Sequence, residues 1–124
     1  MKFAATILSL ALAASSSSAG DVINLNRPDA EGWIKLFNDN DLTGWNGDPK
    51  IWRVKDGYIS GEIDKLVGGN SFLIFKKPFS NYILELEVLL VGRKGNSGIQ
   101  YRSKHSERGA NKWVVKGYQA DFAN

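Results

Sequence analysis

Polar side chains that could bind or transform a small molecule gather near the C-terminal end of the sequence. Gln100 and Arg102 fall on one face of an alternating segment at 97–104, and Gln119 and Asp121 do so in a second segment at 113–122. If both segments are strands of one sheet, these side chains project from the same side. Amides and carboxylates hydrogen-bond hydroxyl groups, and a planar guanidinium can donate two parallel hydrogen bonds to oxygen atoms. The pattern indicates either a sugar-binding face or the solvated outer face that antiparallel sheets often have.

Two carboxylates, Glu85 and Glu87, lie in the clearest strand candidate, residues 82–91. Two acids two residues apart on a strand point the same way and lie about 6–7 Å apart. That spacing suits acid–base work on a glycoside, although exposed Glu at alternate strand positions is also ordinary. If this strand shares the sheet of the two C-terminal segments, both carboxylates join the polar face.

The remaining chemistry-bearing residues give weaker signals. The sequence has no Cys, which excludes thiol catalysis and Cys-based zinc sites. Its only His, His105, is expected in an exposed polar loop at 105–111, with a general base as the alternative. Trp52 is a candidate for stacking on a sugar ring, with packing as the alternative. No metal motif is present, so no cofactor is evident, and a divalent metal remains an open alternative.

The elements that must position these residues read as short strands. Lys55-Asp56-Gly57 separates two β-rich runs, and Asp-Gly is a strong hairpin signal because Gly tolerates a positive φ. No window carries a helical stripe, so the sequence predicts an all-β sandwich. Residues 38–50 are expected as a loop, and the even-numbered side chains of 82–90 as a core face. The expected strands are 33–37, 51–54, 58–61, 71–75, 82–91, 97–104 and 113–122.

The first nineteen residues have the three parts of a secretory signal. Lys2 supplies the positive charge, residues 3–14 form an apolar run, and residues 15–19 (SSSSA) are small. The apolar run is shorter than the roughly 20 residues that span a bilayer. We therefore expect cleavage after Ala19, a mature domain at 20–124, a periplasmic or secreted location and no membrane association after cleavage.

The charge balance argues against nucleic acid as a partner. Formal net charge is +3, and Lys2 leaves with the expected signal, so the mature domain is only weakly basic. The Lys and Arg residues are mixed with acidic residues rather than clustered, which is typical of a solvated surface.

Five short runs, which form four motifs in order, resemble the 3-keto-disaccharide hydrolase domain family. Residues 32–38 (GWIKLFN) and 41–45 (DLTGW) together match its opening motif. Residues 52–57 (WRVKDG) match a hairpin motif, 96–102 (NSGIQYR) an "NSGi..R" motif and 117–122 (GYQADF) a "GyqaDi" motif. The match covers about residues 31–123.

The resemblance implies a concanavalin A-like jelly-roll β-sandwich that acts on sugars oxidised to a ketone at C3. A base removes the acidified C2 proton, an enolate forms, the C1 substituent leaves and water adds back. By motif position, Asp121 is the candidate base or metal ligand and Arg102 the candidate for stabilising the enolate. Glu85 and Glu87 are kept as alternative catalytic carboxylates. The candidate substrate-binding residues are Gln119, Gln100, Asn96 and Trp52.

The resemblance also implies that the domain is incomplete at its C-terminus, since family domains continue beyond the "GyqaDi" strand. Two functions stay open at this point, with a structural role in a larger envelope protein as a weaker third. One is an enzyme that cleaves 3-keto-glycosides, and the other is a non-catalytic carbohydrate-binding module, because the jelly-roll fold serves both.

Overall fold

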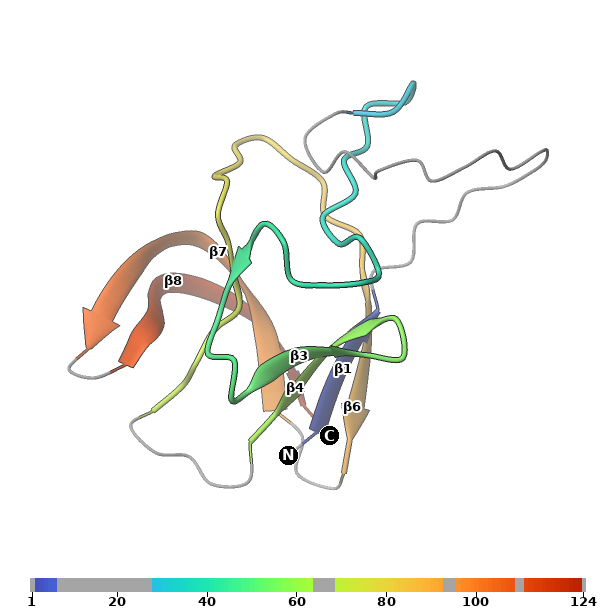
Figure 1. Cartoon of the computed structure of the whole chain (residues 1–124). Coiled ribbons are helices and arrows are strands. Elements are labelled where there is room, and N and C mark those ends of the chain that lie inside the picture. The colour runs from blue at the N-terminus through green and yellow to red at the C-terminus, as the bar shows by residue number, and fades with distance from the viewer. Residues whose placement is uncertain (1, 7–27, 64–68, 93–95, 109–110, 124) are drawn as a thin grey trace.

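The computed structural model describes residues 2–6, 28–63, 69–92, 96–108 and 111–123, and within them the chain is all-β (Figure 1). This confirms the predicted fold class, while the jelly-roll arrangement stays an expectation. The described residues contain no helix that is long and apolar enough to cross a membrane. The strands are β1 Lys2–Thr6, β2 Trp45–Asn46, β3 Trp52–Lys55, β4 Tyr58–Glu62, β5 Ile74–Phe75, β6 Glu87–Val91, β7 Asn96–Arg108 and β8 Asn111–Ala123.

A four-stranded sheet with the order β3-β4-β1-β6 forms one layer of the molecule (Figure 1). The short strands β2 and β5 pair separately, and so do the long strands β7 and β8. β1 is antiparallel to both of its neighbours, with Ala4 opposite Ser60 of β4 and Leu89 of β6. Five residues near the start of the expected signal therefore lie inside the sheet, and the rest of that segment is outside the described residues.

The predicted hairpin at 51–61 is confirmed. β3 and β4 pair with Lys55 opposite Tyr58, so Asp56 and Gly57 form a two-residue turn. Both turn residues have positive φ, 52° and 77°, as a type I′ turn requires. The Asp-Gly pair therefore fixes the register of this hairpin.

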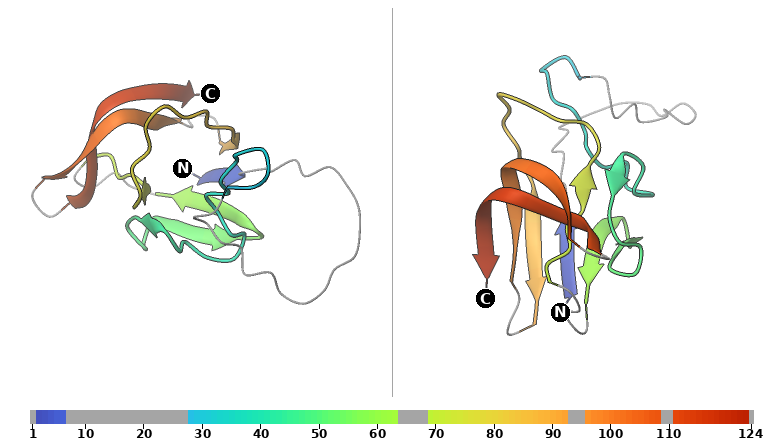
Figure 2. Two further views of the ribbon diagram at one scale, coloured as in Figure 1. Left: turned by 90° about the horizontal axis from the view of Figure 1, so that it is seen from above. Right: turned by 90° about the vertical axis from the view of Figure 1, so that its left-hand side faces the viewer.

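The two C-terminal strands are also confirmed, and they are longer than predicted. β7 and β8 form one curved antiparallel hairpin that arches beside the four-stranded sheet (Figure 2). Strand β7 continues through the predicted loop at 105–111 as far as Arg108. The tip of the hairpin is tied to the rest of the chain, because the Phe72 amide donates to the Trp113 carbonyl at 2.9 Å and the Trp113 indole donates to Asn46 at 3.0 Å.

Two predicted strands are wrong or shortened. Residues 33–37 form no strand: they follow a turn at 30–32, where the Asp29 carboxylate accepts from the Trp33 amide at 2.8 Å, and they pair with no strand among the described residues. The strand predicted at 71–75 is reduced to Ile74–Phe75, since its partner β2 has only two residues. Residues 38–50 are a loop apart from those two residues, Trp45 and Asn46.

The predicted core face of residues 82–91 is only partly realised. Leu86 and Leu90 are half-buried, whereas Tyr82 is 50% exposed and Leu84 and Val88 are each 38% exposed. Strand β6 begins at Glu87 because its partner β1 ends at Thr6, so the ladder stops there. Residues 82–86 consequently have no strand partner among the described residues.

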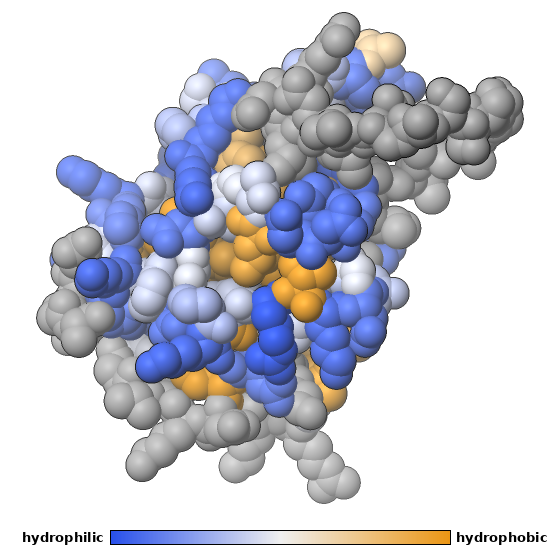
Figure 3. Space-filling view, in the orientation of Figure 1, coloured by the Kyte–Doolittle hydropathy of each residue, from blue (hydrophilic) through white to orange (hydrophobic). Residues whose placement is uncertain are grey.

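The most buried hydrophobic side chains of the described residues are Phe37, which is 1% exposed, and Ile59, which is 3% exposed. On the face seen in Figure 3, apolar surface lies open among hydrophilic side chains. The described strands thus cover each other incompletely, and several large apolar side chains of β6, β7 and β8 are exposed.

Candidate functional site

Four polar side chains of the β7–β8 hairpin form a continuous hydrogen-bonded series, which we call the polar chain. Ser103 donates to Gln100 at 3.1 Å, Gln100 donates to Gln119 at 2.6 Å, and Gln119 donates to the carboxylate of Asp121. Gln100 lies directly opposite Gln119 in the ladder, and Gly98 lies opposite Asp121. Three of the residues predicted for a sugar-binding face, Gln100, Gln119 and Asp121, are thus brought together.

Two motif glycines make room for this series. A Cβ added to Gly98 would lie 2.6 Å from Cγ of Gln119 and 2.7 Å from the carbonyl oxygen of Ala120. A Cβ added to Gly117 would lie 2.2 Å from Oγ of Ser103. Real Cβ atoms essentially never come this close, so the Gly residues of the NSG and GYQAD runs allow the side chains across the ladder to lie flat over them.

An irregularity in β7 lies at Arg102. The ladder shifts register between Tyr101 and Lys104, and Arg102 has a φ of 47°. Such β-bulges interrupt the alternation of side chains and re-aim a residue. Simple alternation from Gln100 therefore no longer determines the face of Arg102, and its place on the polar face stays a prediction. Arg102 is exposed and forms no ion pair within the part of the chain that the structure describes.

Sequence reasoning did not find Ser103. Its hydroxyl contacts both the Gln100 side chain and the Tyr101 carbonyl, the latter at 2.9 Å, and these contacts close the bulge. In a regular strand Ser103 would lie on the face opposite Gln100, so the bulge is what brings them together. The small residue across the ladder, Gly117, was the one sequence signal for this contact.

The carboxylate of Asp121 is the acidic end of the polar chain. Asp121 is exposed, and Gln119 is the partner that donates to it among the described residues. Asn96 also starts β7 at an exposed position, opposite Ala123. By strand alternation Asn96 shares the face of Gly98 and Gln100, so it extends this polar surface beyond Asp121.

The structure does not bring Glu85 and Glu87 to this surface. Glu85 precedes β6 and Glu87 is its first residue, and β6 belongs to the sheet of β1, β3 and β4 rather than to the β7–β8 pair. The condition of one shared sheet is not met, because β6 is the last strand in the order β3-β4-β1-β6 and β7 and β8 form a separate two-stranded sheet. Both glutamates are exposed.

Trp52 packs within the sheet. A Cβ on Gly61, its cross-strand partner, would lie 2.6 Å from the Trp52 ring, so the ring covers that glycine. Trp52 is half-buried, and its indole nitrogen is buried without a partner among the described residues. The structure thus places Trp52 in packing contact and not on the polar face. His105 lies in β7, where its Nε2 is 2.6 Å from the Lys112 carbonyl oxygen.

The described residues contain no group of three His, Asp or Glu side chains arranged to hold a metal ion. Asp121, the residue that the sequence suggested as a ligand, stands with amides and a hydroxyl as its neighbours along the polar chain. Divalent cations in proteins need several oxygen ligands, and this donor set offers one carboxylate. We derive no step through a metal.

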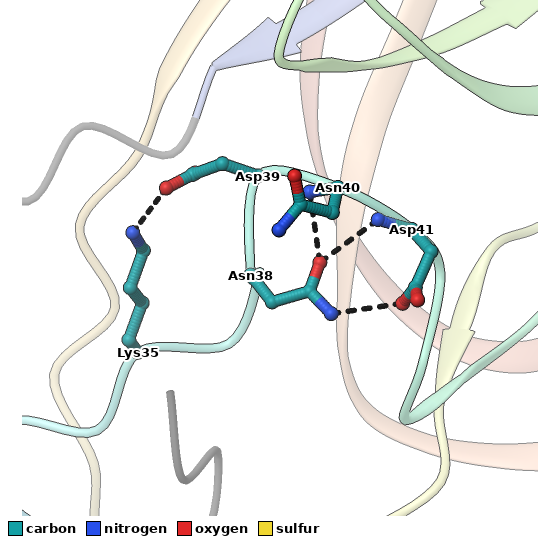
Figure 4. A network of polar contacts seen from close by, with 5 residues as sticks. All are labelled: Lys35, Asn38, Asp39, Asn40 and Asp41. Atoms are coloured by element: carbon teal, nitrogen blue, oxygen red, sulfur yellow. Dashed lines mark hydrogen bonds and ion pairs between the residues drawn. The ribbon is translucent and has the colours of Figure 1, made fainter. Parts of the chain in front are cut away.

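The first motif builds a loop and not part of the polar chain. The Asn38 side chain accepts from the amides of Asn40 and Asp41, at 3.0 and 2.9 Å, and donates to the Asp41 carboxylate at 2.8 Å (Figure 4). Lys35 forms an ion pair with Asp39, whose φ is 66°. The run from Asn38 to Trp45 is therefore a structural turn whose residues satisfy each other's polar groups.

Hydrogen bonds lower the pKa of Asp41 below its ordinary value of 3.8. The largest contribution comes from the Thr43 side chain, followed by the Asn38 side chain and the Thr43 amide, while burial acts weakly in the opposite direction. Donors that contact the ionised carboxylate favour it over the neutral acid. The loop is thus held by an ionised Asp41.

Comparison with known proteins gives a specific match. The model of the 3-keto-alpha-glucoside-1,2-lyase-like domain matches residues 32–124. A 3-keto-disaccharide hydrolase of Bacteroides thetaiotaomicron is 36% identical over an alignment of 96 residues, and the match covers 69% of this chain and 33% of that protein. The chain thus spans about a third of the length of this relative. No solved structure gives a significant match.

Proposed function

Since the chain belongs to the 3-keto-alpha-glucoside-1,2-lyase-like domain family, we propose that it is part of an exported enzyme that cleaves 3-keto-glycosides. The relative's name, 3-keto-disaccharide hydrolase, supports this substrate class. The polar chain on the β7–β8 hairpin carries the proposal, because it joins hydroxyl-binding amides to an exposed carboxylate.

The chemistry follows from the ketone at C3. The ketone acidifies the C2–H bond, and a base takes that proton while the electron pair moves into an enolate. The enolate then expels the C1 substituent, which leaves with a proton, and a C1–C2 double bond remains. Addition of water across that bond returns a proton to C2 and places a hydroxyl at C1. The sum of both halves is hydrolysis.

In this scheme Asp121 is the base. It is exposed, so a sugar can approach it, and Gln119 holds one of its oxygens in place. The amides of Gln100 and Gln119 present further polar atoms to the sugar hydroxyls. Gln100 is itself held by Ser103, so the amide orientation is set along the whole series.

Arg102 is proposed to stabilise the enolate. Its guanidinium always carries a positive charge and presents several donors in a rigid fork. Arg102 lies at the bulge, is exposed and forms no ion pair within the described residues, so its charge is available to a substrate. Electrostatic stabilisation of a developing oxyanion is commonly among the largest contributions to catalysis.

The test uses the product of the natural gene, incubated with a 3-keto-disaccharide and with its unoxidised parent, while release of free 3-keto-sugar is measured. Asp121→Asn is expected to lower the rate by at least about tenfold. Asp56→Asn is the matched control, because Asp56 lies in the β3–β4 turn, where Asn suits the positive φ. Arg102→Asn removes the charge with a residue that tolerates a left-handed backbone.

The outcomes separate the proposed roles. Release from the oxidised substrate alone, lost in Asp121→Asn and kept in Asp56→Asn, supports the assignment. If Glu85→Gln abolishes turnover and Asp121→Asn does not, the base lies outside the polar chain. If a folded protein binds the sugar and releases nothing, the proposed enzyme is a carbohydrate-binding module.

Export is the remaining part of the proposal. The basic, apolar and small-residue parts of residues 1–19 support removal of this segment after Ala19. The intact mass of the purified protein and its cell fraction test this directly. A mass that retains residue 1, in the cytoplasmic fraction, contradicts it.

A further inference from the structure

The β7–β8 hairpin carries a second group of side chains on the face opposite the polar chain. Tyr101 lies opposite Tyr118 in the ladder, and Lys104 lies opposite Lys116. Opposed residues point to the same side of a sheet, and Lys116 and Tyr118 are two residues apart on β8. These four side chains therefore share one face, and we call them the Tyr–Lys patch. Gln119 follows Tyr118 directly and so points to the other face.

The bulge does not disturb this arrangement, because its extra residue lies in β7. Three steps along β7, from Tyr101 to Lys104, match two steps along β8, from Tyr118 to Lys116. β8 thus keeps its regular alternation here, and the register of each pair is given by the ladder itself. Arg102, which is also exposed, lies at the bulge between the two β7 members of the patch.

The two tyrosines form an exposed ring platform. Their ring centroids are 5.8 Å apart and their planes differ by 24°, so the rings stack and hold each other in place. Tyr101 is nevertheless 41% exposed and Tyr118 is 65% exposed. Aromatic rings that carry a polar hydroxyl suit sites where one part of a ligand is apolar and the other is wet. The apolar face of a sugar ring is such a part.

The two lysines form a pair of like charges that this fold places together. Both are exposed, and the ion pairs that the structure gives for the described residues involve other side chains. Like charges directly opposite each other in a ladder are destabilising. The flanking residues of the same face carry no charge that could offset this: they are Ile99, Ser106, Val114 and Ala120. An anion between the two ammonium groups would replace their repulsion with attraction.

We propose that the Tyr–Lys patch binds an acidic carbohydrate, with a sugar ring on the tyrosines and its anionic group between the lysines. The two pairs are two residues apart on β8, which is about 7 Å, and lysine side chains are long and flexible enough to close that distance. A neutral sugar would use the ring platform alone. The lysine pair is the feature that calls for a negative charge.

A carbohydrate fits the patch better than a nucleic acid does. Single-stranded nucleic acids also stack on aromatic rings, but they need a basic groove that follows the backbone over several phosphates. The whole chain has a formal net charge of only +3, with acidic residues mixed among the basic ones. Two neighbouring lysines match one or two anionic groups.

This inference goes beyond the proposed function and does not depend on sugar cleavage. The polar chain and the Tyr–Lys patch lie on opposite faces of one hairpin, so a ligand on the patch leaves the polar chain free. The patch would then attach the protein to an acidic polysaccharide while the other face meets the substrate.

The first experiment is calorimetric titration of the product of the natural gene at low salt. The probes are a short oligogalacturonate, which carries a carboxylate on each ring, and its methyl-esterified form, which has the same backbone without the charge. We expect the acidic form to bind at least about tenfold more tightly, and salt to weaken its binding.

The variants separate the charges from the rings. Lys104→Gln combined with Lys116→Gln should weaken oligogalacturonate binding about tenfold. Lys55→Gln is the matched control, because Lys55 is an exposed lysine opposite an exposed tyrosine, Tyr58, in the β3–β4 hairpin. Tyr118→Phe keeps the ring and should keep the affinity, whereas Tyr118→Leu should reduce it. Release of 3-keto-sugar should be unchanged in the lysine variants, so failure of this inference and failure of the proposed enzyme are told apart.

Thermal unfolding without ligand is the second measurement. Lys116→Gln removes the like-charge pair, so its Tm should rise at low salt, and the gain should disappear at about 1 M salt. A lysine that served only the fold would lower the Tm when replaced.

Four results would overturn the proposal. They are equal affinity for the acidic and esterified forms, unchanged affinity in the double lysine variant, tighter binding of an oligothymidylate than of the oligogalacturonate, and protection of Lys104 and Lys116 from acylation in the natural gene product. The third would assign the patch to nucleic acid, and the fourth would show that another part of the protein covers it.

Discussion

The contact between Trp52 and Gly61 gives the sharpest stability prediction. A methyl group on Gly61 would lie 2.6, 2.9 and 3.0 Å from three carbon atoms of the Trp52 ring. These residues are opposite each other in the β3–β4 ladder, so neither strand can move aside without breaking the pairing. The added methyl group therefore forces the ring out of its position or parts the strands.

Overpacking of this kind costs typically about 1–3 kcal/mol. We expect Gly61→Ala to reduce the free energy of unfolding by about 2 kcal/mol, the middle of that range. In a domain of roughly 100 residues this corresponds to a fall in Tm of about 8–16 °C. Equilibrium urea unfolding measures the free energy, with an unchanged m-value as the sign that the unfolded state is unaffected.

A double-mutant cycle identifies the ring as the cause. Trp52→Leu removes the three close carbons, so Gly61→Ala should cost little in that background, and the coupling energy should approach the full single-mutant effect. An equal cost of Gly61→Ala with Trp and with Leu at position 52 would refute the reasoning. Trp52→Leu should also leave sugar affinity unchanged, because the ring packs on the sheet. A marked loss of affinity in the folded variant would restore Trp52 as a binding residue.

Three further predictions concern the motif residues. Gly98→Ala should displace Gln119 and destabilise the protein by at least about 1 kcal/mol, because the added Cβ would lie too close to the Gln119 side chain and a backbone oxygen. Urea unfolding and the rate of 3-keto-sugar release are measured on the same variant. An unaltered rate would show that the polar chain does not contribute to turnover. Asn38→Ala should cost about 1 kcal/mol through its lost loop hydrogen bonds, with Asn40→Ala as the near-neutral control in the same urea assay. Folding lowers the pKa of Asp41, so its ionised carboxylate stabilises the folded state fully above pH 3.8, the ordinary pKa, and this stabilisation is lost as the pH falls through the pKa of the folded state. The difference in unfolding free energy between the wild type and Asp41→Asn should therefore begin to close below about pH 3.8. A gap that stays constant down to pH 2 would contradict that assignment.

Local patterns were enough for the elements whose partners are close in sequence. The Asp56-Gly57 turn predicted the β3–β4 hairpin, because a two-residue turn with positive φ fixes both the pairing and its register. The alternation of the two C-terminal segments predicted the shared face of Gln100, Gln119 and Asp121. In each case a local rule determines which side chains meet.

Elements that depend on distant partners were predicted less well. The alternating pattern of residues 82–91 predicted a ten-residue strand, and the structure forms a strand only where β1 pairs with it. Glu85, Glu87 and Asp121 would share a face only if their strands shared a sheet, and the structure places those strands in different sheets. The alternation of a strand does not determine which strand lies next to it. The bulge at Arg102, which brings Ser103 to Gln100, arises from a register shift that alternation cannot reveal.

The sequence by itself determined the all-β class, the family and the polar residues that form the candidate site, because composition, turn chemistry and motif order are local properties of the chain. Only the tertiary structure decided which carboxylate joins the two glutamines, that Trp52 packs against Gly61, and that a strand from the expected leader lies between β4 and β6. Those outcomes depend on strand order and register, which are set by hydrogen bonds between segments far apart in the chain.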